Sequence, residues 1–427
     1  MSATDLRAMI LVGDGLGDRP VPALGDKTPL EAQPTPNLDA LAARGQCGLM
    51  DAIAPGVPAG SDTSHFAMLG YDPYQYYTGR GPLEALGVGL EVMLGDLGFR
   101  CNFATVKREA ADLIVVDRRA DRIASGTDEL TAALNSLPPI DDIQFIVKDS
   151  IEHRAALVMR GPALVEGLKN VAASPKPIIT DADPHEEGEP IWRAAATVPE
   201  VQVAAAALNL WIRQAHDVLK EHPVNQAREA NNLPPANAIL PRGCGMAPDL
   251  DPFEERHGTK GGLVVEAGLI KGLGRYIGMD VLDAPGATGG YDTDHISLAK
   301  TAVAALDSSP FVLCNLKAPD LAGHDGDPEK KMEMIAKLDE MAGVLLNEAD
   351  LDKTAIAVTG DHSTPCALED HSGDPLPLII TGYGVRADAI SEYGERPCGM
   401  GSIGRVRGHD ILPMLTTLIG TAHKFGA

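Results

Sequence analysis

The sequence predicts an α/β fold: a mainly parallel sheet with helices on both faces, plus an inserted smaller α/β domain. Two observations support this prediction. At both ends of the 427-residue chain, apolar runs typical of buried parallel strands alternate with helix-like segments. The middle instead has shorter strand-like segments and polar loops, bounded by stretches rich in glycine and proline. We therefore expect one discontinuous domain of residues 1–78 and 250–427, and an inserted domain of residues 79–249.

The N-terminal elements begin with a strand at residues 8–12, an apolar run that ends in the sequence GDGLGD. A helix is expected at residues 35–44, where Thr35 can cap the first turn and a proline follows it. A turn of glycine, proline and serine then leads into a short helix at residues 65–70. Ligands gather beyond the carboxyl ends of parallel strands, so polar residues after the first strand are candidates for a site.

The C-terminal part repeats this alternation of strands and helices. Its apolar runs and periodic segments predict three strands and two helices, at residues 311–316, 354–359 and 376–380 and at residues 332–346 and 410–419. In the inserted domain the same criteria predict strands at residues 112–116 and 155–159 and a helix at residues 201–219.

The composition is that of a soluble globular protein, with 44% apolar residues and a mean hydropathy of −0.04. No apolar run approaches the roughly 20 residues of a membrane helix. The start has no secretory signal pattern, and the six cysteines form no CxxC pair, so a cytoplasmic location is expected. A net charge of −24, with 4% aromatic residues, argues against nucleic acid and anionic membranes as partners. A small anionic substrate stays compatible, because metals and a few arginines can reverse the field locally.

Metal-ligand residue types follow two of the predicted C-terminal strands. They are Asp320, His324, Asp361, His362 and His371. Imidazole together with carboxylate suits Mn²⁺, Zn²⁺ or similar cations, whereas Mg²⁺ and Ca²⁺ sites are usually all oxygen. Five ligands exceed what one catalytic ion with an open position normally takes from protein. Two ions are therefore predicted.

The N-terminal part offers two groups that could complete such a site. Asp14 follows the first strand, although an aspartate between glycines can also simply cap a turn. Ser61 lies on a glycine-flanked turn that opens a helix, where backbone N–H groups favour an anion. Adjacent cations would lower the pKa of its hydroxyl and make it a nucleophile. An ordinary helix cap is the alternative, and Thr63 and Ser64 compete for the role.

The order of these groups closely resembles the alkaline phosphatase superfamily. Within it, the segments VGDGLGD, PTPNLD, AGSDTSH, LGYDP, GRGPLEALG, DRRADRI and TGDHSTPCALEDHSGDP resemble the archaeal-type 2,3-bisphosphoglycerate-independent phosphoglycerate mutases. The resemblance runs from about residue 9 to residue 415, with Ser64 where alanine is typical. It implies an alkaline-phosphatase-like core and an isomerase, an intramolecular phosphotransferase. Such an enzyme interconverts 3-phosphoglycerate and 2-phosphoglycerate in glycolysis and gluconeogenesis, through a phosphoserine and without bisphosphoglycerate.

Carried over by position, the resemblance implies two divalent metal ions, manganese first, with magnesium, cobalt or zinc as alternatives. One ion would be held by Asp14, Ser61, Asp361 and His362, and the other by Asp320, His324 and His371. Ser61 would also be the nucleophile.

A small phosphorylated hydroxy acid needs groups that hold its carboxylate and phosphate, and the planar fork of arginine does so in a bidentate way. The substrate-binding candidates are Arg118, Arg119, Arg122, Arg154 and Arg80, with Arg160 and Arg242 beside them, although a single arginine is more often a solvated surface group. The resemblance adds Lys260 as a catalytic residue and His185 as a phosphate contact. Asp117 or Asp183 could act as the acid/base, and the sequence does not choose between them.

Two other functions stay open from the sequence. A metal-dependent phosphatase or another phosphomutase of the same superfamily would share the core and differ in the product. A non-catalytic metal- or nucleotide-binding protein on the same scaffold would not need Ser61 at all. The oligomeric state also stays open, a homo-oligomer included.

Overall fold

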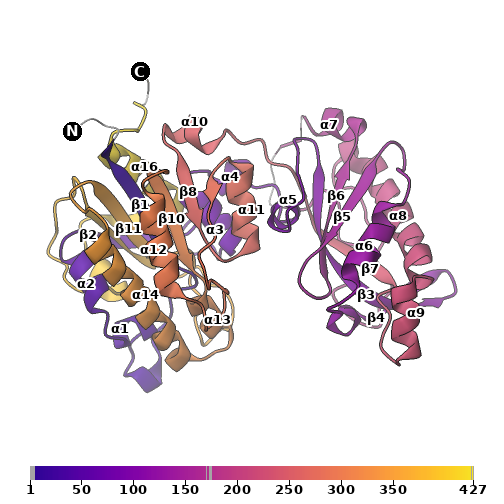
Figure 1. Ribbon diagram of the computed structural model, residues 1–427, viewed down its shortest axis with the longest axis horizontal. Helices are drawn as coiled ribbons and strands as arrows, with labels where there is room; N and C mark the ends of the chain where they lie inside the picture. The colour runs from indigo at the N-terminus through magenta and orange to yellow at the C-terminus, as the bar shows by residue number, and fades with distance from the viewer. Residues whose placement is uncertain (1–4, 170, 173–175, 425, 427) are drawn as a thin grey trace. The chain divides into compact units, whose positions relative to one another are not determined.

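A computed structural model of the chain describes residues 5–169, 171–172, 176–424 and 426 (Figure 1). Its contacts divide the chain into two compact units. Unit 1 consists of Met1–Pro73 and Asp251–Ala427, and unit 2 of Tyr74–Leu250. The crossings that the sequence placed after residues 78 and 249 thus fall after residues 73 and 250.

Unit 1 is built on an eight-stranded sheet with the order β13-β2-β12-β11-β1-β10-β8-β9. The strands are β1 (Arg7–Gly13), β2 (Gln46–Asp51), β8 (Gly261–Val264), β9 (Asp280–Val281), β10 (Phe311–Leu316), β11 (Thr354–Gly360), β12 (Leu376–Gly382) and β13 (Gly404–Arg407). The central strand β1 runs parallel to both of its neighbours, β10 and β11. All residues of β10 and β11 are buried, which explains why these strands appear in the sequence as unbroken apolar runs.

Strand β12 departs from the parallel arrangement and runs antiparallel to both β11 and β2. The connection from β11 to β12, residues 361–375, contains no helix. A parallel neighbour is usually reached through a crossover helix, whereas an antiparallel neighbour needs only a loop. The helix-free connection fits the reversed direction of β12, and this loop carries three of the predicted metal ligands.

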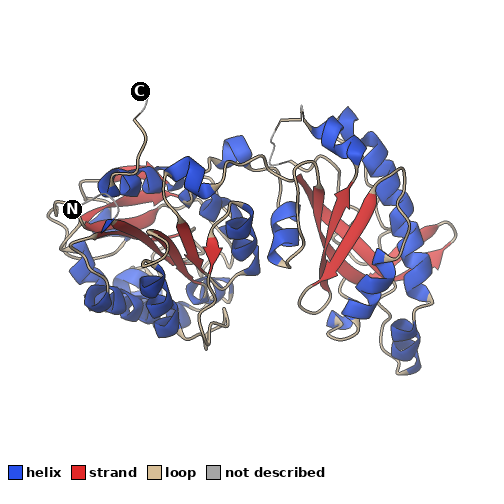
Figure 2. Cartoon of the chain, turned by 45° about the horizontal axis from the view of Figure 1, so that its top comes forward, coloured by secondary structure: helices blue, strands red, loops and turns tan. Residues whose placement is uncertain are grey.

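Helices cover both faces of the unit 1 sheet (Figure 2). They are α1 (Pro29–Ala32), α2 (Pro36–Ala42), α3 (Ser61–Met68), α10 (Phe253–His257), α11 (Gly268–Tyr276), α12 (His295–Ala305), α13 (Ala318–His324), α14 (Pro328–Glu348), α15 (Glu395–Cys398) and α16 (Gly408–Ile419). One group forms around α14, which contacts α2, α12 and α13, and another around α3, which contacts α11 and α16. Among the described residues, no helix is both long enough and apolar enough to cross a bilayer.

Unit 2 is an antiparallel sheet with helices, built from one continuous segment. Strand β3 (Leu97–Glu109) pairs along its length with β4 (Asp112–Asp117), β6 (Arg154–Arg160) and β7 (Ala238–Met246), and β5 (Gln144–Asp149) pairs with β6. Its longer helices are α5 (Gly81–Gly87), α6 (Thr127–Asn135), α7 (Pro162–Leu168), α8 (Gln202–Lys220) and α9 (Pro223–Ala230). Helices α6 and α8 cover one face, and α5 lies on the other (Figure 1). Trp211 of α8 stacks on Phe145 of β5 with ring centroids 5.0 Å apart.

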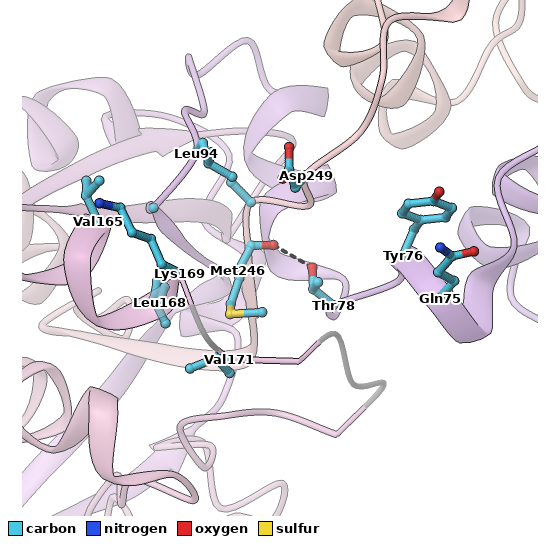
Figure 3. A pocket seen from close by; sticks show the side chains of 12 residues that line it. Gln75, Tyr76, Thr78, Leu94, Val165, Leu168, Lys169, Val171, Met246 and Asp249 are labelled. Carbon is cyan, nitrogen blue, oxygen red and sulfur yellow. Dashed lines mark hydrogen bonds between the residues drawn. The ribbon is translucent and has the colours of Figure 1, made fainter. Parts of the chain in front are cut away.

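The two ends of the unit 2 segment lie side by side. The Thr78 hydroxyl donates a hydrogen bond to the Met246 carbonyl, beside a pocket of about 380 Å³ (Figure 3). Gly79 has φ +120°, and a Cβ there would lie 2.7 Å from the Cys244 carbonyl oxygen. Glycine is therefore required where the two backbones approach. The α/β fold class predicted from the sequence, with a mainly parallel sheet and a second, smaller unit, is confirmed.

Candidate metal centre

All seven predicted metal ligands lie in unit 1, at or beside the carboxyl edge of its sheet. Asp14 follows β1, Asp320 and His324 belong to α13 after β10, Asp361 and His362 follow β11, Ser61 opens α3, and His371 lies in the loop before β12. The parallel strands β1, β10 and β11 end at the same edge, so the topology itself brings most of these side chains together.

Four of the side chains face one another and form what we call the first ligand group: Asp14, Ser61, Asp361 and His362. The Nε2 atom of His362 lies 3.1 Å from the Ser61 hydroxyl oxygen, 3.3 Å from Asp361 Oδ2 and 3.7 Å from Asp14 Oδ1. Asp14, Asp361 and His362 are each at most 1% exposed. These distances are those expected between donor atoms that share one small cation.

The other three side chains form the second ligand group: Asp320, His324 and His371. Asp320 Oδ1 lies 3.6 Å from His324 Nε2 and 3.7 Å from His371 Nε2. The two histidine Nε2 atoms are 3.2 Å apart. The group is less buried than the first, with the His324 side chain 39% exposed.

The second ring nitrogen of each histidine fixes its tautomer. His324 Nδ1 lies 2.8 Å from the Glu369 carbonyl oxygen, and His371 Nδ1 lies 2.7 Å from the Ala59 carbonyl oxygen. A carbonyl can only accept, so both Nδ1 atoms donate and a neutral ring presents an Nε2 lone pair to the other. Two lone pairs at 3.2 Å repel unless a cation lies between them, and this arrangement is typical of histidine metal ligands.

The buried carboxylates also fit cations. Asp361 Oδ2 is buried and finds no hydrogen-bond partner among the described residues. Burial raises the pKa of Asp361, and burial together with the nearby Asp361 charge raises the pKa of Asp14. Burial also lowers the pKa of His362 to about 3, so its ring is neutral and free to ligate. Nitrogen and oxygen donors in both groups therefore fit divalent cations of the manganese-to-zinc series.

Two residues that the sequence did not single out connect the ligand groups. The Thr364 hydroxyl donates to Asp320 Oδ1 at 2.6 Å and therefore accepts from His362 Nδ1 at 3.0 Å. The Lys317 ammonium lies 2.8 Å from Asp14 Oδ1 and 2.7 Å from Asp320 Oδ2. Although burial acts in the opposite direction, Lys317 holds the pKa of Asp320 below its ordinary range. Their only signal in the sequence is proximity to ligands, since Lys317 precedes Asp320 by one helical turn.

The competition among the three hydroxyls near Ser61 is resolved by their hydrogen bonds. Thr63 Oγ1 donates to the Gly60 carbonyl, and the Ser64 hydroxyl donates to the same carbonyl at 2.8 Å. Ser61, at the first turn of α3, is the member of the three whose hydroxyl reaches His362. Helix α3 begins four residues earlier than the residue 65 expected from the sequence, which puts Ser61 inside its first turn.

Lys260 is not brought to the ligand groups. It precedes β8, whose first residue Gly261 pairs with Phe311 at the amino end of β10, while the ligands follow the carboxyl end of β10 at Leu316. Lys260 therefore lies at the opposite edge of the sheet. The lysine that contacts the ligand carboxylates is Lys317.

Unit 2 gathers basic side chains around a cavity of about 170 Å³. Its lining residues are Arg100, Arg118, Arg119, Arg122, Arg154 and Arg242, with Asn102, Glu152 and His153. Five of these six arginines were named from the sequence, and Arg100 was missed. Strand register accounts for the cluster, because Arg100 of β3 pairs with Arg242 of β7 and Asn102 pairs with Arg154 of β6.

The other unit 2 candidates lie outside this cavity lining. Arg80 forms an ion pair with Glu84, one helical turn away. His185 Nε2 lies 3.0 Å from Asp181 Oδ2, and its ring packs edge-on against Trp192.

The two acid/base candidates are both engaged by neighbours. Asp117 accepts from the backbone N–H groups of Arg119 and Asp121 and so caps the turn that follows β4. Asp183 is fully buried and accepts two bonds from Arg118, at 2.9 and 2.6 Å. Burial acts to raise the pKa of Asp183, but the hydrogen bonds from Arg118 hold this pKa below its ordinary value. Asp183 thus orients Arg118, and the identity of the acid/base stays a prediction.

Comparison with known proteins extends this picture over the whole chain. The family model of 2,3-bisphosphoglycerate-independent phosphoglycerate mutase matches residues 42–225. Relatives of that name from Methanosphaera stadtmanae and Methanopyrus kandleri are 46% and 45% identical, covering 99% and 100% of this chain and 100% of each relative.

Two solved structures are also similar to this chain. A protein from Pyrococcus horikoshii has a TM-score of 0.84 at 38% identity, covering 99% of both chains. The cofactor-independent phosphoglycerate mutase from Thermoplasma acidophilum has a TM-score of 0.74 at 36% identity, covering 97% of this chain and 100% of that one. Full-length similarity to these relatives, on a fold that agrees with it, defines an isomerase of the metal-dependent phosphomutase class. The chain belongs to the family of 2,3-bisphosphoglycerate-independent phosphoglycerate mutases.

Proposed function

We propose that this chain interconverts 3-phosphoglycerate and 2-phosphoglycerate through a phosphoserine at Ser61, without bisphosphoglycerate. The observation that supports this most directly is the position of the Ser61 hydroxyl, 3.1 Å from His362 in the first ligand group. Full-length similarity to the phosphoglycerate mutases supports the choice of substrate. The proposal assigns the chain to glycolysis and gluconeogenesis in the cytoplasm.

The two ligand groups would each hold one divalent cation, manganese in the first place, with magnesium, cobalt or zinc as alternatives. The first group would hold one through Asp14, Ser61, Asp361 and His362, and the second group the other through Asp320, His324 and His371. Bound there, the cations lower the pKa of the Ser61 hydroxyl and neutralise charge on the transferring phosphoryl oxygens.

The side chains of unit 1 perform the transfer itself. Ser61 Oγ, as the deprotonated alkoxide, attacks the phosphorus of 3-phosphoglycerate, and the bond from phosphorus to the O3 oxygen breaks while O3 takes up a proton from the acid/base group. The O2 hydroxyl of the same glycerate then returns a proton to that group and attacks the phosphoserine, and the bond from phosphorus to Oγ breaks, which restores the Ser61 alkoxide. The N–H groups in the first turn of α3 favour the anionic phosphoryl group beside Ser61.

The arginine-lined cavity of unit 2 favours a mutase over a phosphatase. A phosphatase can release glycerate after the first transfer, whereas a mutase must hold it and keep water away until the second. Arginine forks of this cavity would bind the carboxylate throughout, with Arg118 already oriented by Asp183. Asp117 and Asp183 stay the proposed acid/base groups for the proton that passes between O3 and O2.

Rapid acid quenching of the manganese-loaded protein with 3-phosphoglycerate tests the proposal. We expect one phosphoryl group on the peptide that contains Ser61, detected by mass spectrometry, and accumulation of 2-phosphoglycerate. Ser61→Ala should lose both, with turnover reduced by more than about 10³-fold. Ser64→Ala is the matched control three residues away, and it should keep both.

Two results would contradict the proposal in different ways. Release of inorganic phosphate in excess of 2-phosphoglycerate, with Ser61 intact, would identify a phosphatase. Unchanged turnover in Ser61→Ala would remove Ser61 from the chemistry altogether.

A further inference from the structure

Lys317 occupies a central place among the predicted metal ligands. It is the first residue after β10, and its side chain is only 21% exposed. Its ammonium contacts one carboxylate from each ligand group, Asp14 at 2.8 Å and Asp320 at 2.7 Å. The two groups are therefore joined by a positive charge that belongs to the chain itself.

We propose that Lys317 is a resident counter-ion of the metal centre, which stabilises the empty ligand groups and weakens their hold on divalent cations. This inference rests on the proposed function only in so far as the two ligand groups bind cations. It assigns Lys317 no direct contact with the substrate.

The charge balance of the site supports this role. Asp14, Asp320 and Asp361 are all at least 98% buried, and their carboxylates converge on His362. Buried like charges destabilise a fold unless a cation pairs with them. Lys317 supplies one positive charge to these three carboxyl groups, so it reduces the repulsion between them, and the site is net negative for divalent ions when all three are ionised.

The position of the ammonium is fixed by the end of β10. Asn315, near the end of the strand before Lys317, donates its amide to Asp14 Oδ2 at 3.1 Å, so both side chains reach the same carboxylate. The Lys317 backbone N–H donates to Glu266 Oε2 at 2.8 Å, which holds the start of α13 in place. Hydrogen bonds of both its backbone and its side chain therefore fix Lys317 in the site.

The two carboxylate oxygens of Asp320 contact different partners. Oδ2 accepts from Lys317, while Oδ1 faces His324 and His371 in the second ligand group. On Asp14, by contrast, Lys317 contacts Oδ1, the oxygen that faces His362. An incoming cation therefore shares this Asp14 oxygen with the ammonium, and the two positive charges repel.

Lys317→Met tests the inference through thermal unfolding and Mn²⁺ titration of the purified protein. After treatment with a chelator, the variant should unfold at a Tm about 5 °C below that of the wild type, because its carboxylates lose their counter-ion. Its Kd for Mn²⁺, measured by calorimetry, should become about tenfold tighter, because one repelling charge a few ångströms away is gone. A residue with a merely structural role would lower the Tm without tightening Mn²⁺ binding.

Three further variants complete the experiment. Lys317→Gln keeps a donor of similar reach without the charge and should shift both quantities in the same directions, whereas Lys317→Arg keeps the charge and should stay near wild type. Lys300→Met removes a lysine paired on the surface with Glu348 and should change neither. An unchanged Kd, or weaker Mn²⁺ binding, in Lys317→Met and Lys317→Gln overturns the inference. Absence of Mn²⁺ binding by the wild type would instead refute the metal centre.

Discussion

The hydroxyl of Thr364 offers a sharp test of how the two ligand groups are connected. It donates to Asp320 Oδ1 and accepts from His362 Nδ1, and it is fully buried. Thr364→Val keeps the shape of the side chain and removes only these two hydrogen bonds. The variant therefore isolates the link between the groups.

The expected magnitudes follow from these two contacts. A hydrogen bond to a charged acceptor contributes about 1.5–3 kcal/mol, and the bond from the imidazole N–H about 1 kcal/mol. Both partners stay buried in the variant, so the free energy of unfolding of the metal-free protein should fall by about 3 kcal/mol. Loss of a partner behind a metal ligand typically weakens metal binding by about 10–100-fold.

Urea unfolding after chelation measures the first quantity, and Mn²⁺ calorimetry measures the second. Thr359→Val is the matched control, because this threonine of β11 is equally buried and its hydroxyl has no hydrogen-bond partner among the described residues. The control should be neutral or slightly stabilising. If Thr364→Val and Thr359→Val behave alike in both measurements, the connecting role of Thr364 is refuted.

Three further predictions concern the second ligand group, the arginine-lined cavity and a buried acid. Asp320→Ala or His371→Ala should abolish turnover while circular dichroism shows a folded protein, and turnover retained without the second ion would refute the two-metal mechanism. Arg154→Ala should raise the KM for 3-phosphoglycerate by about 10–100-fold, because one charge-assisted hydrogen bond to the substrate is lost. Arg108 is exposed on the surface, and Arg108→Ala should leave the KM unchanged. Burial raises the pKa of Glu395 to about 7, so the folded chain keeps a proton that the unfolded chain releases above about pH 4.5. The free energy of unfolding should therefore fall by about 3 kcal/mol as the pH rises from about 4.5 to about 7. Glu395→Gln should remove this fall in urea unfolding at pH 5 and pH 8, and an unchanged pH dependence would show that other groups cause it.

The parts of the fold that the sequence predicted are those with strong local signals. The strands β1, β10 and β11 are buried on both faces, so their apolar runs are continuous, and the sequence-based bounds agree within two residues. The direction of β12 was not predicted, because an apolar run is the same in both directions. The start of α3 was placed too late, because its first four residues are polar and carry no apolar period.

The candidate site shows the same division between local and spatial information. Aspartate and histidine at strand ends form an unusual pattern that the sequence alone shows, and the family resemblance assigned them to two metal ions. Lys317 and Thr364 have ordinary identities, and only the fold brings them against ligands. Arg100 lines the cavity because of the register of β3, which the sequence does not specify. Lys260 precedes β8 at the edge opposite the ligand groups, and its catalytic role stays a prediction.

The position of β1 in the middle of the unit 1 sheet has a consequence for synthesis of the chain. Its two neighbours are β10 and β11, which begin at residues 311 and 354. At the usual 5–20 residues per second, β1 leaves the ribosome roughly 15–60 s before either partner exists. Throughout that interval an apolar strand with two unpaired edges must be kept from aggregating, while unit 2, encoded in one piece, can already fold. The proposed phosphoryl transfer could therefore not begin before residue 371 is synthesised, since Asp14 and Ser61 would act together with ligands from residues 320–371.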